Sequence, residues 1–149
     1  MASLDLKEVD FCVIKEDYSR FVLDDETIIK AKIVVRKIFV SPINTPEGYP
    51  TQTAFDGTNI VVAKVPASLK RNPSKEPLNI QVDKGEEIRH IKEDIHEQEY
   101  ITDNGFRITV RPVLTKVFRY SKYDMFGDPI YNVSLQQITN VDKMQSTAT

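Results

Sequence analysis

The chain has 149 residues, of which 40% are hydrophobic and 28% charged, a balance typical of one folded domain or two small ones. Its net charge of -2 produces no overall field that would draw the chain to nucleic acid or to an anionic membrane. The single cysteine, Cys12, excludes an internal disulfide, and no apolar run reaches the roughly 18 residues that cross a membrane.

The first third of the chain predicts two short strands, a turn and a long strand. Apolar residues at 9–14 and 21–23 indicate the short strands, and the acidic run Asp24-Asp25-Glu26 predicts a turn. Apolar and basic residues then alternate, which places one set inside and the other outside. The expected inner row is Ile29, Ala31, Ile33 and Val35, and the expected outer row is Lys30, Lys32 and Arg36. Lys37 then falls on the inner row, so a one-residue bulge is needed to restore the pattern.

The loop at 41–50 holds three prolines and ends in Gly48-Tyr49-Pro50. Glycine tolerates a positive φ and proline fixes the exit of a turn, so this loop is expected to be semi-rigid and exposed. Such a loop suits partner contact, and Gly127 and Pro129 belong to a second G-x-P sequence of the same kind. We therefore assign Gly48, Tyr49, Pro50, Gly127 and Pro129 to a candidate partner-binding loop.

Further strands are expected at 59–65, 78–82 and 130–135. The polar segment 67–77, which contains Pro73 and Pro77, reads as a linker. The chain then divides into a first β module at 1–66, a second at 78–141 and a tail at 142–149.

The two halves resemble each other. The tetrapeptide I-K-E-D occurs at 14–17 and again at 91–94, and residues 21–39 align without gaps on 100–118 at an offset of 79. In the second copy Ile108, Val110 and Leu114 take the inner row, and Lys116 breaks the phase as Lys37 does. The order of these features favours an internal duplication, and Asn104-Gly105 is a strong hairpin signal.

The segment 86–100 allows two interpretations. Ile88, Ile91 and Ile95 have helical spacing among helix-forming residues, so propensity favours a short helix near 86–98. The duplication favours a strand through Ile91 instead. Both alternatives remain open from the sequence.

The candidate chemistry is sparse, because no catalytic or phosphate-binding motif occurs. His90, Asp94, His96 and Glu97 contain ligand-type side chains, but a solvated charged face explains them better than a metal site. A basic strand face with nearby aromatic residues is how small β-barrels hold single-stranded nucleic acid. The residues that fit this description are Lys30, Lys32, Arg36, Arg107, Arg111, Tyr120 and Tyr123.

The sequence therefore predicts an all-β protein of two tandem, related small modules, barrel- or sandwich-like, that pack with pseudo-two-fold symmetry. Each module is small for independent stability, so a shared core is expected. We expect a cytoplasmic, non-enzymatic protein without a cofactor or a metal that binds a protein partner or itself, and that has no membrane partner. The alternative is a β-barrel protein that binds single-stranded nucleic acid.

Overall fold

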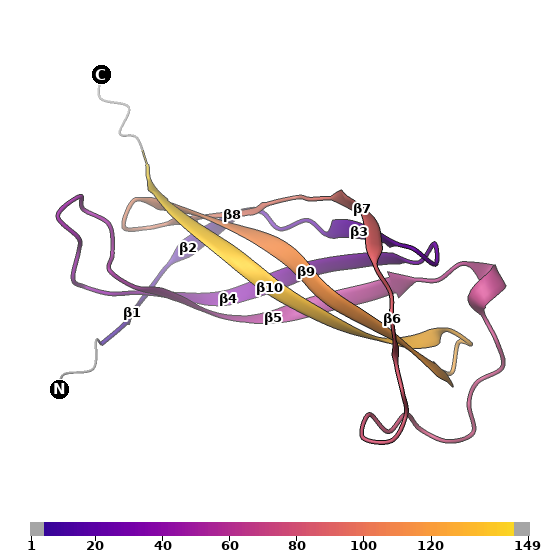
Figure 1. Ribbon diagram of the computed structural model, residues 1–149. Helices are drawn as coiled ribbons and strands as arrows, with labels where there is room; N and C mark the ends of the chain where they lie inside the picture. Colours follow the sequence, from indigo (N-terminus) through magenta and orange to yellow (C-terminus); the bar gives the residue numbers. More distant parts are fainter. Residues whose placement is uncertain (1–4, 145–149) are drawn as a thin grey trace.

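The computed structural model describes residues 5–144 and contains two antiparallel β-sheets packed face to face (Figure 1). Sheet A contains β1 (Lys7–Val9), β3 (Ser19–Leu23), β4 (Ile28–Val40), β5 (Thr53–Lys64) and β7 (His90–Asp94). Sheet B contains β2 (Phe11–Lys15), β6 (Glu86–Glu87), β8 (Gln98–Thr102), β9 (Phe106–Tyr123) and β10 (Pro129–Lys143). A single turn of 3-10 helix, η1 (Ala67–Leu69), lies after β5. The predicted all-β, sandwich-like fold is confirmed, and the sheets do not close into a barrel.

The two halves of the chain exchange strands. β2, from the first half, pairs with β8, and β7, from the second half, pairs with β3. Each sheet therefore contains one strand from the other half. Without β2, the backbone groups along one edge of β8 would lose their hydrogen-bond partners in sheet B, and without β7 those along one edge of β3 would lose theirs in sheet A. The two halves therefore depend on each other for their backbone hydrogen bonds.

The pairing of the two halves matches at the offset of 79 residues seen in the sequence. β1 pairs with β4 through Glu8 and Phe39, and β6 pairs with β9 through Glu87 and Phe118. Lys15 lies opposite Glu99, and Asp94 lies opposite Arg20. The last two pairs show that Lys15 corresponds to Asp94, so the two I-K-E-D sequences are two residues out of register and do not mark equivalent positions.

The predicted bulges are also confirmed. The ladder between β4 and β5 shifts between Val35 and Lys37, and the ladder between β9 and β10 shifts between Ser134 and Leu135, opposite Thr115. Lys37 and Lys116 point outward as a result, and Ile38 and Val117 are buried.

The core consists of two clusters that correspond at the same offset. One is formed by Phe21, Leu23, Ile29, Ala31, Ile88, Leu114 and Val117, and the other by Val35, Ile38, Val40, Tyr100, Ile108 and Val110. Each cluster draws residues from both halves of the chain. The predicted inner rows of β4 and β9 are buried, except that Ile33 is only half-buried.

Of the two alternatives for residues 86–98, the strand is confirmed and the helix is wrong, and the strand expected at 78–82 is not formed. Residues 86–98 contain no helix, because β7 pairs with β3 in a ladder whose register shifts at Ile91, a residue that is 68% exposed. Residues 78–82 form a turn instead of a strand. The side chain of Asn79 accepts a hydrogen bond from the Gln81 amide at 3.0 Å, and local bonding of this kind competes with a strand.

β10 continues through Lys143, two residues into the segment expected to be a tail, and residues 145–149 lie outside the described part of the chain. No helix within residues 5–144 has the length and apolar character needed to cross a membrane.

Candidate functional site: the open edges of β5 and β10

The predicted basic face is divided between the two sheets. Lys30, Lys32 and Arg36 belong to β4 in sheet A, whereas Arg107 and Arg111 belong to β9 in sheet B. Since the alternate residues of both strands pack between the sheets, the two basic rows project from opposite outer faces. No single surface therefore contains all five cations.

Most of these cations also contact other side chains. The Arg36 guanidinium contacts both carboxylate oxygens of Asp56, at 2.8 and 3.4 Å, and its hydrogen bond lowers the pKa of Asp56. The Nζ atoms of Lys30 and Lys32 lie 5.6 and 4.6 Å from the centre of the Tyr18 ring. Arg107 pairs with Glu99 at 3.0 Å, and Arg111 is exposed.

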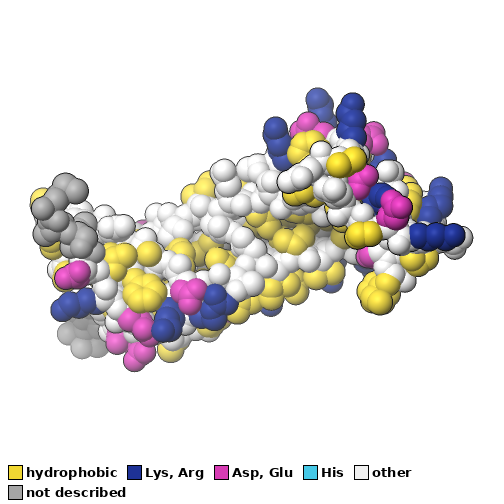
Figure 2. All heavy atoms as spheres, turned by 90° about the horizontal axis from the view of Figure 1, so that it is seen from below, with side chains coloured by type: hydrophobic (Ala, Val, Ile, Leu, Met, Phe, Trp, Pro, Cys, Tyr) yellow, Lys and Arg dark blue, Asp and Glu magenta, His cyan; other side chains and the backbone are white. Residues whose placement is uncertain are grey.

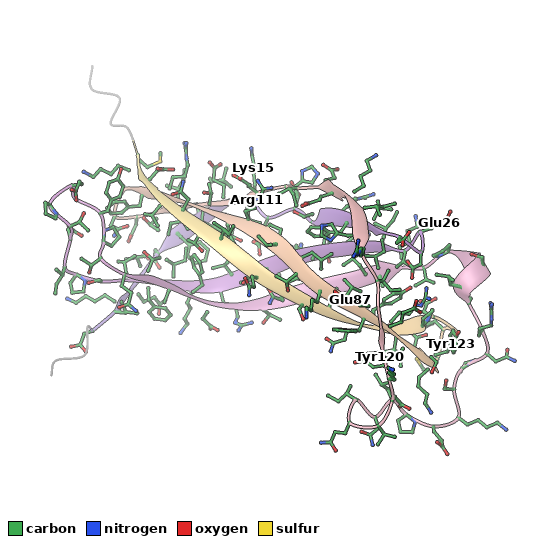
Figure 3. All side chains as sticks on the ribbon, in the orientation of Figure 1. Lys15, Glu26, Glu87, Arg111, Tyr120 and Tyr123 are labelled. Carbon is green, nitrogen blue, oxygen red and sulfur yellow. The ribbon has the colours of Figure 1, made fainter. Side chains whose placement is uncertain are left out.

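The predicted aromatic residues, Tyr120 and Tyr123, lie apart from the basic residues of β9. In Figure 3, Arg111 lies near the middle of β9, and Tyr120 and Tyr123 lie toward its far end. Tyr120 is 9% exposed, so its ring cannot stack on a base without a rearrangement. Tyr120 and Tyr123 line a groove with Arg71 and Lys84.

Both predicted G-x-P sequences form turns with the same geometry. Gly48 and Gly127 have φ angles of 89° and 83°, in the region that favours glycine. A Cβ atom on Gly127 would lie 2.5 Å from the carbonyl oxygen of Arg71, so the linker packs directly on this turn. Tyr49 is half-buried, with the ammonium of Lys143 5.1 Å from its ring centre, and Pro50 is half-buried beside it. Pro129 is buried at the start of β10.

The histidine-rich segment does not form a ligand cluster. His90 lies 3.6 Å from Glu93 and His96 lies 3.3 Å from Asp94, in separate pairs. Within residues 5–144, no three His, Cys, Asp or Glu side chains are grouped as they would be around a metal ion.

Sequence reasoning missed a polar network at the end of the first core cluster. Asp25, whose side chain is only 8% exposed, accepts hydrogen bonds from the Arg119 guanidinium at 2.9 Å and from the Tyr131 hydroxyl at 2.7 Å. Burial alone would raise the pKa of Asp25, but the hydrogen bonds from Tyr131, Thr27 and Arg119 outweigh burial and lower it. Burial, together with Asp25, raises the pKa of Tyr131 to about 12. The acidic turn was the available signal, but its partners are about 100 residues away.

In the described part of the chain, two long strands of the fold, β5 and β10, each have one edge without a paired strand. Among the described residues, β5 pairs only with β4 and β10 pairs only with β9. Native proteins usually protect such edges with charged residues or proline. Yet β10 contains no charged residue from Pro129 to Val141, and β5 contains none from Gly57 to Ala63. By contrast, the edge strand β7 carries Lys92, Glu93 and Asp94.

A groove lies between these two strands, and we call it the β5–β10 groove. It has a volume of about 470 Å³ and is lined by Val61, Ala63, Ile130 and Val133, with Asp124 and Asp128 at one end. Along the strands, Gln137 donates a hydrogen bond to Asn59 at 2.7 Å and links β10 to β5. The Oδ1 atom of Asp128 is buried without a hydrogen bond, and the Lys70 ammonium lies 3.5 Å from it.

The comparisons with known proteins supply no relative: no family model, no curated protein and no solved structure matches the chain.

Proposed function

We propose that this protein is a non-enzymatic assembly module that binds a protein partner or a second copy of itself through the open edge of β10. The observation that carries the proposal is the free, uncharged edge from Pro129 to Val141. An unpaired edge presents a row of backbone donors and acceptors, which another strand satisfies by pairing.

The surface near this edge supports the same proposal. Val61 and Val62 of β5 are 39% and 41% exposed, and Ile138 of β10 is 58% exposed. Figure 2 shows apolar side chains among charged ones at the right-hand end of the molecule, where β10 begins and the segment after η1 lies in Figure 1. Exposed apolar surface next to an open edge favours contact with protein.

We also propose that the fold arose by duplication of a unit of about half the chain. The matched registers, bulges and core clusters at one offset support this origin. A single unit would lack the strand that the other half provides, so the ancestral unit would have paired with a second copy. Assembly through strands would then be an old property of this chain.

The experiment compares the wild-type protein with the variant Ser134→Lys/Gln136→Lys, which places two cations on exposed positions of β10. The matched control is Gln52→Lys/Ser68→Lys, two exposed positions outside the strands. Sedimentation velocity measures self-association, and the immobilised proteins are compared for the partners they retain from the native cell extract. We expect association in the wild type and the control and its loss in the β10 variant. Equal association of all three proteins, or none in the wild type, would contradict the proposal.

A further inference from the structure

Segment 78–84 has the pattern of a strand but not the structure of one. Leu78, Ile80 and Val82 alternate with polar residues. In the structure the amides of Val82 and Asp83 donate to the Asn79 carbonyl at 3.1 and 2.7 Å, which closes a turn. Ile80 and Val82 are left 68% and 77% exposed. Two large apolar side chains on one projecting loop favour burial in an assembly.

Two residues that line the β5–β10 groove, Ala63 and Val133, have smaller side chains than their equivalents in the other half of the chain. Ala63 lies opposite Ile29 as Val141 lies opposite Ile108, and Val133 lies opposite Val117 as Phe55 lies opposite Ile38. Phe55 and Val141 pack on the second core cluster, and Ala63 and Val133 pack on the first, where their smaller side chains also line the groove. The groove therefore offers room for added apolar side chains beside the open edge of β10.

The same molecule cannot bring segment 78–84 to this edge. The segment leads into β6, which pairs with β9 at Phe118 and Arg119, whereas β10 pairs with the other edge of β9. To reach the free edge of β10, the segment would have to cross both strands. Figure 1 likewise shows this part of the chain projecting away from the sheets. A second copy has no such constraint.

We propose, building on the proposed function, that segment 78–84 of a second copy opens into a strand and adds to the free edge of β10. Period-two spacing then directs Leu78, Ile80 and Val82 of the second copy to one face, over the groove. The added strand could run in either direction along β10. The direction that brings Lys84 of the second copy close to Asp124 and Asp128 is favoured, because opposite charges then meet. Each copy offers one segment and one edge, so two exchanges close a two-fold dimer.

The test uses the full chain and two variants that damage opposite sides of the contact. Ile80→Ser/Val82→Ser removes the apolar side chains of the segment, and Ser134→Lys/Gln136→Lys obstructs the edge. Ile91→Ser is the matched control, since Ile91 is 68% exposed like Ile80 but lies on β7. Circular dichroism checks that each variant keeps the β fold.

Sedimentation velocity over a range of micromolar concentrations then gives the dimer Kd. We expect a dimer for the wild type and for Ile91→Ser, and a Kd at least about tenfold higher for each of the two damaging variants. A mixture of these two variants should associate more tightly than either alone, because an intact segment then meets an intact edge.

Three results would overturn the inference. A wild-type chain that stays monomeric would exclude the dimer. A segment variant that dimerises like the wild type while the edge variant does not would remove segment 78–84 from the contact and leave the proposed function standing. Unchanged dimerisation of both variants would contradict the inference and the proposed edge together.

Discussion

Ile33 and Pro112 occupy equivalent positions, 79 residues apart, and the two halves satisfy the backbone there in different ways. Ile33 belongs to β4, and one edge of β4 pairs first with β3 and then with β1, with a gap between them at Ile33. Pro112 belongs to β9, and one edge of β9 pairs with β8 and then with β6, with the equivalent gap at Pro112. At Ile33 the Gln98 side chain completes the ladder, since Oε1 accepts from the Ile33 amide at 2.9 Å and Nε2 donates to its carbonyl at 2.6 Å. Pro112 has no amide hydrogen to satisfy.

The first prediction concerns Gln98, which is 1% exposed. Gln98→Leu leaves the part-buried Ile33 amide and carbonyl without these partners and removes a buried hydrogen bond to the Tyr100 hydroxyl, so the free energy of unfolding should fall by roughly 1–3 kcal/mol. Chemical denaturation measures the change. Gln137→Leu, which removes an exposed side-chain hydrogen bond, is the control and should have a smaller effect. Equal effects of the two substitutions would show that the Gln98 bridge adds no more stability than an exposed side-chain hydrogen bond does.

The second prediction concerns the equivalent turns at Glu26 and Gly105. Both have positive φ, 73° and 89°, and Figure 3 places Glu26 at the turn between β3 and β4. A Cβ atom added to Gly105 would meet no other atom within 4 Å, so Gly105→Ala tests backbone conformation alone. It should lower the free energy of unfolding by about 1–2 kcal/mol.

Glu26→Gly is the reciprocal substitution, and it should raise the free energy of unfolding because glycine tolerates a positive φ. The gain should be smaller than the loss in Gly105→Ala, because glycine also has more conformational freedom in the unfolded chain. Thermal melts of the two variants should therefore shift in opposite directions. Shifts in the same direction would contradict the equivalence of the turns.

The third prediction concerns the pH dependence of the Asp25 network. Its hydrogen bonds favour the carboxylate and hold the pKa of Asp25 below its ordinary value of 3.8. The stability that they supply is therefore present above pH 3.8 and is lost as the pH falls through the lower pKa of the folded state. Asp25→Asn should lower the free energy of unfolding by roughly 1–3 kcal/mol at neutral pH.

The difference between Asp25→Asn and the wild type should narrow in acid. Asp24→Asn serves as the control, since Asp24 is exposed in the same turn. A difference that stays constant below pH 3.8 would show that the charge of Asp25 does not contribute.

The fourth prediction addresses the nucleic-acid alternative. Because the basic rows lie on opposite faces, we expect no complex with a single-stranded oligonucleotide in a gel shift at low salt. The double variant Lys32→Ser/Arg111→Ser should behave like the wild type. A complex that weakens steeply with salt in the wild type, and disappears in the double variant, would favour nucleic-acid binding instead.

The sequence predicted the strands whose patterning is local and strong. The alternation in 28–40, the phase change at Lys37 and Lys116, and the offset between the halves all follow from side-chain periodicity, and all appear in the fold. What it could not predict depends on distant pairing. β7 is a strand because β3 lies beside it, although the local propensity of 86–98 favours a helix.

The candidate site was harder to predict for the same reason. The basic row of β4 and that of β9 look equivalent in sequence, and only the packing of the sheets shows that they face away from each other. The open edge of β10 requires the strand order, which the sequence does not contain. Its lack of charge from Pro129 to Val141 was visible, but it acquires meaning only once the strand lies at an edge.

Hydrogen–deuterium exchange of the full-length protein at high and low concentration tests the central claim most directly, because it reports on the β10 edge itself. Roughly half of the β10 amides point away from β9, since ladder bonding alternates along an antiparallel strand. We predict that these amides exchange slowly in concentrated protein and rapidly after dilution, while the amides bonded to β9 stay protected at both concentrations. Rapid exchange of the outward amides at both concentrations would contradict self-assembly through this edge.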